Sequence, residues 1–172
     1  MNIQFLPYTF IAEAQLTEMI FALYSAGDGM ERMTHEKIKS TINHYKNNTS
    51  GGTIYIFYKN ADTAGYAIVN RFWSNEYGGW VAFLDELFVC EEFRSLGIGA
   101  SFLKFLEGNK KYKSIFLEVY PENHSAYNFY RRQGFEISKS DYDAIKLQSM
   151  IKVREYTNKT LQFQGEKTFQ GK

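Results

Sequence analysis

Cysteine and proline are scarce in this chain, which has one cysteine and two prolines among its 172 residues. The single thiol, Cys90, excludes an internal disulfide and favours a reducing compartment. The three histidines have neither a cysteine cluster nor metal-ligand spacing beside them, so we expect no metal site.

Long apolar runs are also missing. No segment approaches the roughly 20 apolar residues that a membrane helix needs. The opening residues, MNIQFLPYTF, lack the basic region and the apolar segment of a signal peptide. We therefore expect a cytoplasmic protein that does not bind membranes.

Charge of either sign is not in excess: 20 basic residues face 19 acidic ones, which leaves a net charge of +1. A near-neutral chain without a basic aromatic stripe does not favour nucleic-acid binding. What is present is 44% hydrophobic and 17% aromatic residues, enough for one globular core. We expect one domain over residues 1–152 and a polar tail over residues 153–172.

The apolar spacing indicates helices and strands in mixed order. A short strand near residues 2–6 is followed by two amphipathic helices, the second capped by Thr34. Residues 53–73 predict an antiparallel hairpin, and WVAFLDELFV predicts a further strand. A helix, a strand, a short helix opened by Asn123 and closing strands complete an α/β or α+β pattern.

The stretch FRSLGIGASFLKFL, residues 93–106, places two glycines between an arginine and an apolar helix. Unpaired N–H groups and the helix dipole favour an anion at a helix N-terminus. Gly97 and Gly99 lack Cβ, so a phosphate can approach the backbone, and Arg94 can add a charge-assisted contact. The alternative is a tight turn without a ligand. Phe102 stands where a third dinucleotide-loop glycine would be, and no G-K-[ST] follows.

These residues resemble the GNAT family of N-acetyltransferases. The segment LDELFVCEEFRSLGIGASFL matches the family's strand, R/Q-x-x-G-x-G/A loop and helix through Arg94, Gly97 and Gly99. The segment LEVYPENHSAYNFYRRQGF matches a second motif through Asn123 and Tyr130. The resemblance covers about Leu84 to Phe135 and implies a mixed, mostly antiparallel sheet of six to seven strands with about four helices.

The resemblance also implies acetyl-CoA as co-substrate and acetyl transfer to an amine. Backbone groups of the strand would pair with the pantetheine arm, the glycine loop would hold the pyrophosphate, Asn123 would bond the pantetheine and Tyr130 would lie near the sulfur. The cofactor-binding positions are then Leu87, Phe88, Val89, Arg94, Ser95, Leu96, Gly97, Ile98, Gly99, Ala100, Asn123 and Tyr130.

Amide formation requires a neutral amine, and a carboxylate can remove the amine's proton. Asp85 and Glu86 are the candidates, because charges among apolar strand residues are costly without a use or a partner. Adjacent strand residues face opposite sides, so only one should reach the thioester unless the strand bulges. We favour Asp85, which shares alternation with Val89, over Glu86. Pairing of both with Arg or Lys, or a water relay, is the alternative.

Tyr130 is the candidate acid for the thiolate leaving group, because a phenol within hydrogen-bond reach can supply a proton. The alternative is a core aromatic on the helix face that also holds Ala126 and Tyr127. Cys90 is expected to pack rather than to act as a nucleophile, since no His–carboxylate pair accompanies it.

The acceptor is expected to be a small cationic amine, similar to the substrates of polyamine and aminoglycoside acetyltransferases. Carboxylates and aromatic faces suit a cation. The elements expected to build that site offer Glu13, Asp28, Glu31, Tyr24, Tyr45, Trp73, Tyr77 and Trp80. A protein N-terminus or lysine as acceptor, and a non-catalytic acyl-CoA-binding module, are the alternatives. The aromatic closing strands are compatible with a homodimer.

Overall fold

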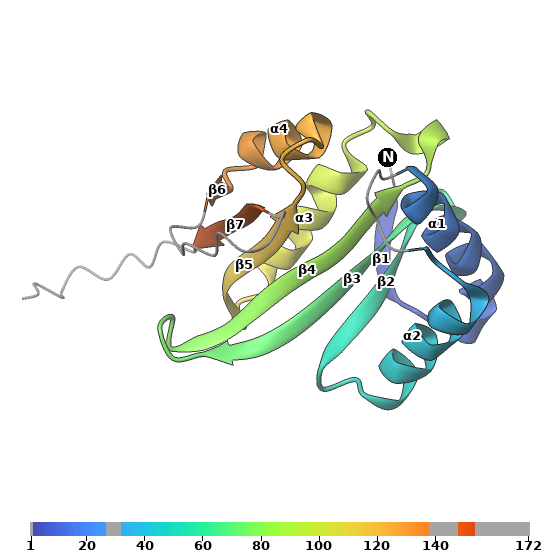
Figure 1. The fold of residues 1–172 in the computed structure, drawn as a ribbon, viewed down its shortest axis with the longest axis horizontal. Helices are drawn as coiled ribbons and strands as arrows, with labels where there is room; N and C mark the ends of the chain where they lie inside the picture. The colour runs from blue at the N-terminus through green and yellow to red at the C-terminus, as the bar shows by residue number, and fades with distance from the viewer. Residues whose placement is uncertain (1, 27–31, 138–147, 154–172) are drawn as a thin grey trace, which may run out of the picture.

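The computed structural model describes residues 2–26, 32–137 and 148–153, and its helices and strands follow one another in mixed order (Figure 1). The strands are β1 (Ile3–Pro7), β2 (Gly52–Lys59), β3 (Asp62–Ser74), β4 (Gly79–Val89), β5 (Tyr112–Val119), β6 (Glu136–Ile137) and β7 (Gln148–Val153). The helices are α1 (Glu13–Ala26), α2 (His35–Asn47), α3 (Ile98–Gly108) and α4 (His124–Arg132), with 3-10 turns η1 (Phe10–Ala12) and η2 (Glu91–Phe93).

The strands form one seven-stranded sheet in the order β1-β2-β3-β4-β5-β7-β6. Among these described strands, β4 and β5 run parallel, as their connection through α3 requires, and the other pairs are antiparallel. The expected sheet size, mixed direction and four helices are therefore confirmed. The predicted tail at residues 153–172 lies, apart from Val153, outside the described residues, as do residues 143–147 of the predicted closing strand.

The sheet separates two apolar cores. On one face α1 and α2 pack against β2, β3 and β4 through residues such as Leu16, Ile42 and Tyr66. On the other face α3 and α4 pack against the same strands and β5 through residues such as Phe102 and Phe135. Burying a side chain of this size contributes about 1.5–3 kcal/mol, so each helix pair is held by its apolar stripe.

Helix ends follow the sequence signals. The Thr34 hydroxyl accepts from the Lys37 amide at 3.3 Å, which confirms this residue as the N-cap of α2. A 3-10 turn over Phe10–Ala12 leads directly into α1, which begins at Glu13. No helix among the described segments is long and apolar enough to cross a membrane.

The middle strand β4 carries a bulge, which the alternation of side chains along the sequence does not predict. In the register with β3, Glu86 lies opposite Ile68 and Leu84 opposite Val69, so Asp85 is an extra residue without a partner on β3. Leu84, Leu87 and Val89 pack on the α3 side, whereas Phe88 packs on the α1 side. The expectation that Asp85 shares a face with Val89 is therefore wrong, because the bulge shifts the phase of the strand.

The parallel strands separate directly beyond this bulge. The last paired residues of β4 and β5 are Leu84 and Leu117, although β4 stays paired with β3 up to Val89. Residues 85–89 of β4 thus have no strand on their β5 side within the described chain. A strand edge that is open on one side can accept hydrogen bonds from an extended ligand.

Candidate active site

The loop between β4 and α3 has the backbone geometry of a tight anion-binding turn. Ser95 and Gly97 both adopt positive φ, at 60° and 76°. Gly97 is the N-cap residue of α3, and no atom lies within 4 Å of the position that a Cβ on it would take. This glycine is therefore required by its left-handed conformation, and the space beside it is open.

The first turn of α3 leaves amide donors available. The first helical hydrogen bond runs from the Ser101 amide to the Gly97 carbonyl, at 2.9 Å. The amides of Ile98, Gly99 and Ala100 precede it and have no intrahelical acceptor. Such amides, with the positive end of the helix dipole, suit a phosphate group.

The backbone amide of Arg94 is already used in a hydrogen bond within the protein. Its amide donates to the Glu91 carbonyl at 3.1 Å, and its Nε donates to the Val89 carbonyl at 3.1 Å. The guanidinium carbon lies 5.9 Å from the centre of the Phe88 ring. The remaining guanidinium N–H groups, rather than the amide, are the part of Arg94 that can meet a ligand.

Gly99 lies where a side chain would come close to neighbouring residues. A Cβ there would lie 3.2 Å from Cζ of Phe129 and 3.9 Å from a methyl carbon of Leu87. This close approach lets α4 pack against the N-terminus of α3. The glycine pair thus serves two purposes, an open left-handed turn and a tight helix contact.

A cavity of about 650 Å³ lies over this turn and the open edge of β4. Every predicted cofactor position lines it except Leu96, whose side chain is 38% exposed. The lining residues are Leu23, Leu87, Phe88, Val89, Phe93, Arg94, Ser95, Gly97, Ile98, Gly99, Ala100, Asn123, Ser125, Ala126, Phe129, Tyr130 and Arg132.

The sequence does not indicate that some of these residues line a cavity. Arg132 lies on the exposed side of α4, next to a second arginine, and nothing in the sequence separates the two. Leu23 shares the apolar stripe of α1 with core residues. Only the packing of α1 and α4 around the cavity distinguishes them.

Asn123 is the N-cap of α4, and its Oδ1 accepts from the Ala126 amide at 3.0 Å. That bond fixes the side-chain amide and leaves its NH2 group to donate toward the cavity that Asn123 lines. The capping bond therefore orients the group that the family resemblance assigns to the pantetheine.

Tyr130 is partly buried between two aromatic rings, with ring-centre distances of 5.1 Å to Phe129 and 5.7 Å to Phe135. Its ring belongs to the core, yet the residue also lines the cavity. Burial raises the pKa of the Tyr130 phenol above its ordinary value. The phenol therefore stays protonated at neutral pH and can act as a proton donor.

Glu86 is held by two tyrosine hydroxyls on the α1 face of the sheet. Tyr24 of α1 donates to Oε1 at 2.8 Å, and Tyr66 of β3 donates to Oε2 at 2.6 Å. Burial raises the pKa of the Glu86 carboxyl, while the two hydroxyls partly oppose the shift.

Asp85 lies on the same face because of the bulge. Asn70 of β3 donates to its Oδ2 at 3.4 Å, a long bond, and Tyr45 of α2 donates to the Asn70 Oδ1 at 2.7 Å. Part of the side chain is exposed, but the carboxyl group is deep enough that burial raises its pKa. Neither carboxylate pairs with an Arg or Lys of the described chain, so no ion pair within these residues accounts for them.

Neither Asp85 nor Glu86 lines the cavity, but residues next to them or to their partners do. Leu23 lines the cavity and its neighbour Tyr24 bonds Glu86. Leu87, which follows Glu86 on β4, also lines the cavity. The last turn of α1 and the middle of β4 therefore border both places.

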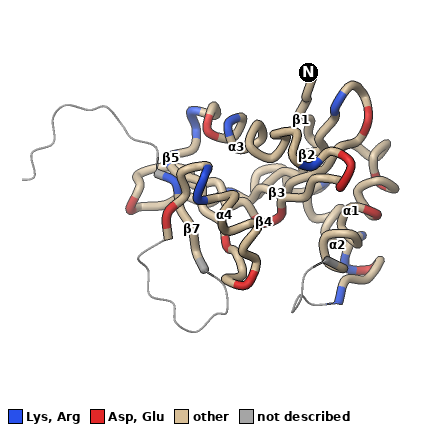
Figure 2. Tube along the Cα trace, turned by 90° about the horizontal axis from the view of Figure 1, so that it is seen from above, with Lys and Arg blue, Asp and Glu red and all other residues tan. Residues whose placement is uncertain are grey.

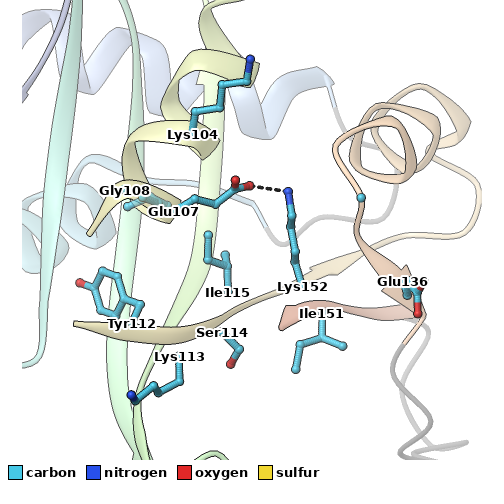
Figure 3. Close-up of a pocket in the computed structure, with 12 residues that line it drawn as sticks. Lys104, Glu107, Gly108, Tyr112, Lys113, Ser114, Ile115, Glu136, Ile151 and Lys152 are labelled. Carbon is cyan, nitrogen blue, oxygen red and sulfur yellow. Dashed lines mark hydrogen bonds and ion pairs between the residues drawn. The ribbon is translucent and has the colours of Figure 1, made fainter. Parts of the chain in front are cut away.

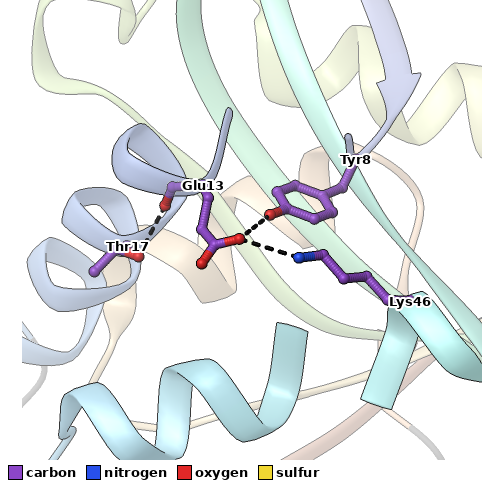
Figure 4. Close-up of polar contacts among 4 residues, drawn as sticks. All are labelled: Tyr8, Glu13, Thr17 and Lys46. Atoms are coloured by element: carbon purple, nitrogen blue, oxygen red, sulfur yellow. Dashed lines mark hydrogen bonds and ion pairs between the residues drawn. The ribbon is translucent and has the colours of Figure 1, made fainter. Parts of the chain in front are cut away.

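The expected acceptor residues are only partly brought together. Tyr24 reaches the Glu86 carboxylate directly, and Tyr45 reaches that of Asp85 only through Asn70. Glu13 does not, because Lys46 donates to its carboxylate at 3.1 Å and Tyr8 at 3.0 Å at the start of α1 (Figure 4). Asp28 and Glu31 lie outside the described residues.

The aromatic residues of the β3–β4 hairpin are elsewhere. The ring centres of Trp73 and Trp80 lie 5.9 Å apart in an edge-to-face arrangement near the end of the hairpin. The hairpin extends away from the helices (Figure 1). Tyr77 lies in the turn between these strands. The expectation that they line the acceptor site is not supported by this position.

Cys90 is partly buried, its thiol lies 3.9 Å from the Thr63 carbonyl, and burial raises its pKa. A thiol with a raised pKa is a poor nucleophile. The described residues contain no group of three or more His, Cys, Asp or Glu side chains that could hold a metal ion.

A second, larger cavity of about 780 Å³ lies at the other end of α3 (Figure 3). Figure 3 shows its central feature, Glu107 and Lys152 pointing toward one another, with Nζ 2.6 Å from Oε1. None of the predicted site residues lines it. Basic and acidic residues are interspersed over the described trace without a face of one sign (Figure 2).

The fold and the first cavity define an α/β protein in which a helix N-terminus with the geometry that suits an anion lies beside an open strand edge. The acetyltransferase (GNAT) family matches residues 15–135. The chain belongs to this family and is an acetyl-CoA-dependent N-acetyltransferase. A comparison with curated proteins gives no match.

Solved structures share the fold at low sequence identity. An acetyltransferase from Thermus thermophilus is 20% identical with a TM-score of 0.72, over 90% of this chain and 98% of the other. PaiA N-acetyltransferase from Thermoplasma acidophilum, in complex with coenzyme A, is 17% identical with a TM-score of 0.65, over 90% and 100%. Ribosomal-protein-alanine N-acetyltransferase from Brucella melitensis is 17% identical with a TM-score of 0.68, over 88% and 99%.

Proposed function

We propose that this acetyltransferase acts on the primary amine of a small cationic molecule, by direct attack within a ternary complex. The observation that carries the proposal is the pair of carboxylates, Asp85 and Glu86, on one face beside the cofactor cavity and without a cationic partner in the described chain. Half-buried negative charge without a counter-ion attracts a cation, and an ammonium group is the substrate form of an amine at neutral pH.

The residues around the cavity fit acetyl-CoA. The amides of Ile98, Gly99 and Ala100 and the Arg94 guanidinium would hold the pyrophosphate. The open edge of β4 at Leu87–Val89 would pair with the pantetheine arm, and the Asn123 NH2 would donate to it. The coenzyme A complex of the PaiA relative supports the choice of cofactor.

The transfer step follows from the residues present. One of the two carboxylates takes a proton from the ammonium group, and the neutral nitrogen attacks the thioester carbonyl carbon. A C–N bond forms, the C–S bond breaks, and the sulfur leaves with its electron pair, while the nitrogen loses its second proton to solvent to become the neutral amide. Tyr130 gives that sulfur its phenolic proton and is reprotonated from solvent. The products are the N-acetylated amine and free coenzyme A.

Thiol release from acetyl-CoA with a panel of acceptors tests the proposal. The panel holds a linear polyamine, an aminoglycoside, a lysine-containing peptide and a peptide with a free N-terminal alanine. We expect turnover with the small cations and little with the peptides. Faster turnover of either peptide would favour the protein-acetylating alternative, and cofactor binding without turnover of any amine would contradict the proposed acceptor class.

A further inference from the structure

The two carboxylates differ in how their oxygens are used. Each oxygen of Glu86 accepts a short hydrogen bond from a tyrosine hydroxyl, which fixes the group from both sides. Asp85 has one long bond, from Asn70 to Oδ2, and its Oδ1 has no partner in the described chain. The accessible acceptor oxygen in this pair is therefore that of Asp85.

The orientation of Asn70 is set by a third residue. A carboxylate only accepts hydrogen bonds, so the part of the Asn70 amide that faces Asp85 has to be the NH2 group. The carbonyl oxygen then faces α2, where the Tyr45 hydroxyl donates to it at 2.7 Å. Tyr45 stabilises this orientation over the flipped one.

The absence of a side chain at Gly52 provides the space for the Tyr45–Asn70 hydrogen bond. A Cβ there would lie 2.7 Å from the Asn70 Oδ1 and 2.7 Å from a ring carbon of Tyr45. Contacts this short do not occur, so any larger residue would displace the hydrogen-bonded pair. The chain of side chains Tyr45–Asn70–Asp85 therefore depends on a glycine on the neighbouring strand β2.

We propose that Asp85 is the group that binds the ammonium of the acceptor, and that Asn70 and Tyr45 are positioning residues that aim it. Glu86, held by Tyr24 and Tyr66, supplies fixed negative charge and does not contact the acceptor. The inference rests on the proposed function and divides its two carboxylates into separate roles. It assigns acceptor selection to a chain of hydrogen bonds that runs from α2 through β3 to the bulge of β4.

Steady-state kinetics with a cationic alkylamine and with an aromatic amine, which is uncharged at neutral pH, test the assignment. Asn70→Leu removes the donor to the carboxylate and should raise KM for the alkylamine about tenfold, with Tyr45→Phe about threefold. Both should leave the KM for the aromatic amine and the Kd for acetyl-CoA near the wild-type values. Loss of a merely structural contact would not separate the two amines in this way.

Tyr8→Phe is the matched control, because its hydroxyl also bonds a carboxylate, that of Glu13, but at the far end of α1. It should change none of these constants. Among the carboxylate variants, Asp85→Asn should raise the alkylamine KM more than Glu86→Gln does.

A wild-type protein that acetylates neither amine would overturn both the proposed function and this inference. Wild-type turnover together with unchanged alkylamine KM in Asn70→Leu would overturn the inference alone. An equal or larger KM increase in Glu86→Gln than in Asp85→Asn would also overturn it.

Discussion

The Tyr66 hydroxyl donates to Oε2 of Glu86 across 2.6 Å, between two strands that are paired over most of their length. Burial nevertheless raises the pKa of both Glu86 and its neighbour Asp85. If either carboxylate accepts the amine's proton, kcat/KM must fall on acidification at a pH above the ordinary carboxyl range. We expect that acid limb in the wild-type pH–rate profile, and a profile that falls only near the ordinary carboxyl pKa would contradict it.

The same raised pKa makes a prediction for stability. The folded state binds the Glu86 proton more tightly than the unfolded state does, so this group lowers the free energy of unfolding as pH rises from 4.5, the ordinary value, to the raised value. Glu86→Gln removes that loss. Its unfolding free energy relative to wild type should therefore increase over this interval and then stay level, as measured by urea unfolding at several pH values. A constant difference would show that the pKa of Glu86 is not raised.

Tyr130→Phe removes the proposed proton donor without changing the ring packing against Phe129 and Phe135. General acid catalysis contributes about 10²- to 10⁴-fold, so kcat should fall within that range while the Kd for acetyl-CoA changes little. Tyr127→Phe, on the same helix but outside the cavity lining, is the control. Unchanged kcat in Tyr130→Phe would leave this tyrosine as a core aromatic.

The two adjacent arginines of α4 should behave differently. Arg132 lines the cofactor cavity, whereas Arg131 donates to the Phe135 carbonyl at 3.3 Å. Arg132→Ala should weaken acetyl-CoA binding, and the effect should shrink at high salt, because a charge contact with phosphate is screened. Arg131→Ala should lower the melting temperature and leave affinity unchanged. Equal affinities in wild type and Arg132→Ala would show that the guanidinium does not reach the cofactor.

Lys152 and Lys46 offer a matched pair for stability. Lys152 bonds both Glu107 and the Gln133 carbonyl, at 2.6 and 2.7 Å, and joins β7 to the ends of α3 and α4 (Figure 3). Lys46 bonds Glu13 in a more exposed pair, with side chains 38% and 49% accessible against 31% and 34% for Lys152 and Glu107 (Figure 4). Lys152→Met should cost about 1–3 kcal/mol and Lys46→Met less than about 1 kcal/mol. Thermal unfolding measures both, and a larger loss in Lys46→Met would reverse this ranking.

Local signals in the sequence were sufficient for the order of elements and for the loop around Gly97. Glycine spacing, apolar periodicity and the Thr34 cap depend on residues that are near one another in the chain. The position of Asp85 could not be predicted, because the bulge is a property of the β3–β4 register. The partners Tyr24 and Tyr66 lie 62 and 20 residues from Glu86, and only the packed sheet brings them to the carboxylate.

The central claim is that the turn at Gly97 and the open edge of β4 bind acetyl-CoA. Titration calorimetry with the wild type and with Gly97→Val measures this directly, since a branched side chain strains the left-handed turn and fills the open space beside it. The account predicts one acetyl-CoA per chain for the wild type and a large loss of affinity in the variant, with circular dichroism confirming that the variant is folded. No heat of binding in the wild type, or the same affinity in a folded Gly97→Val, would contradict it.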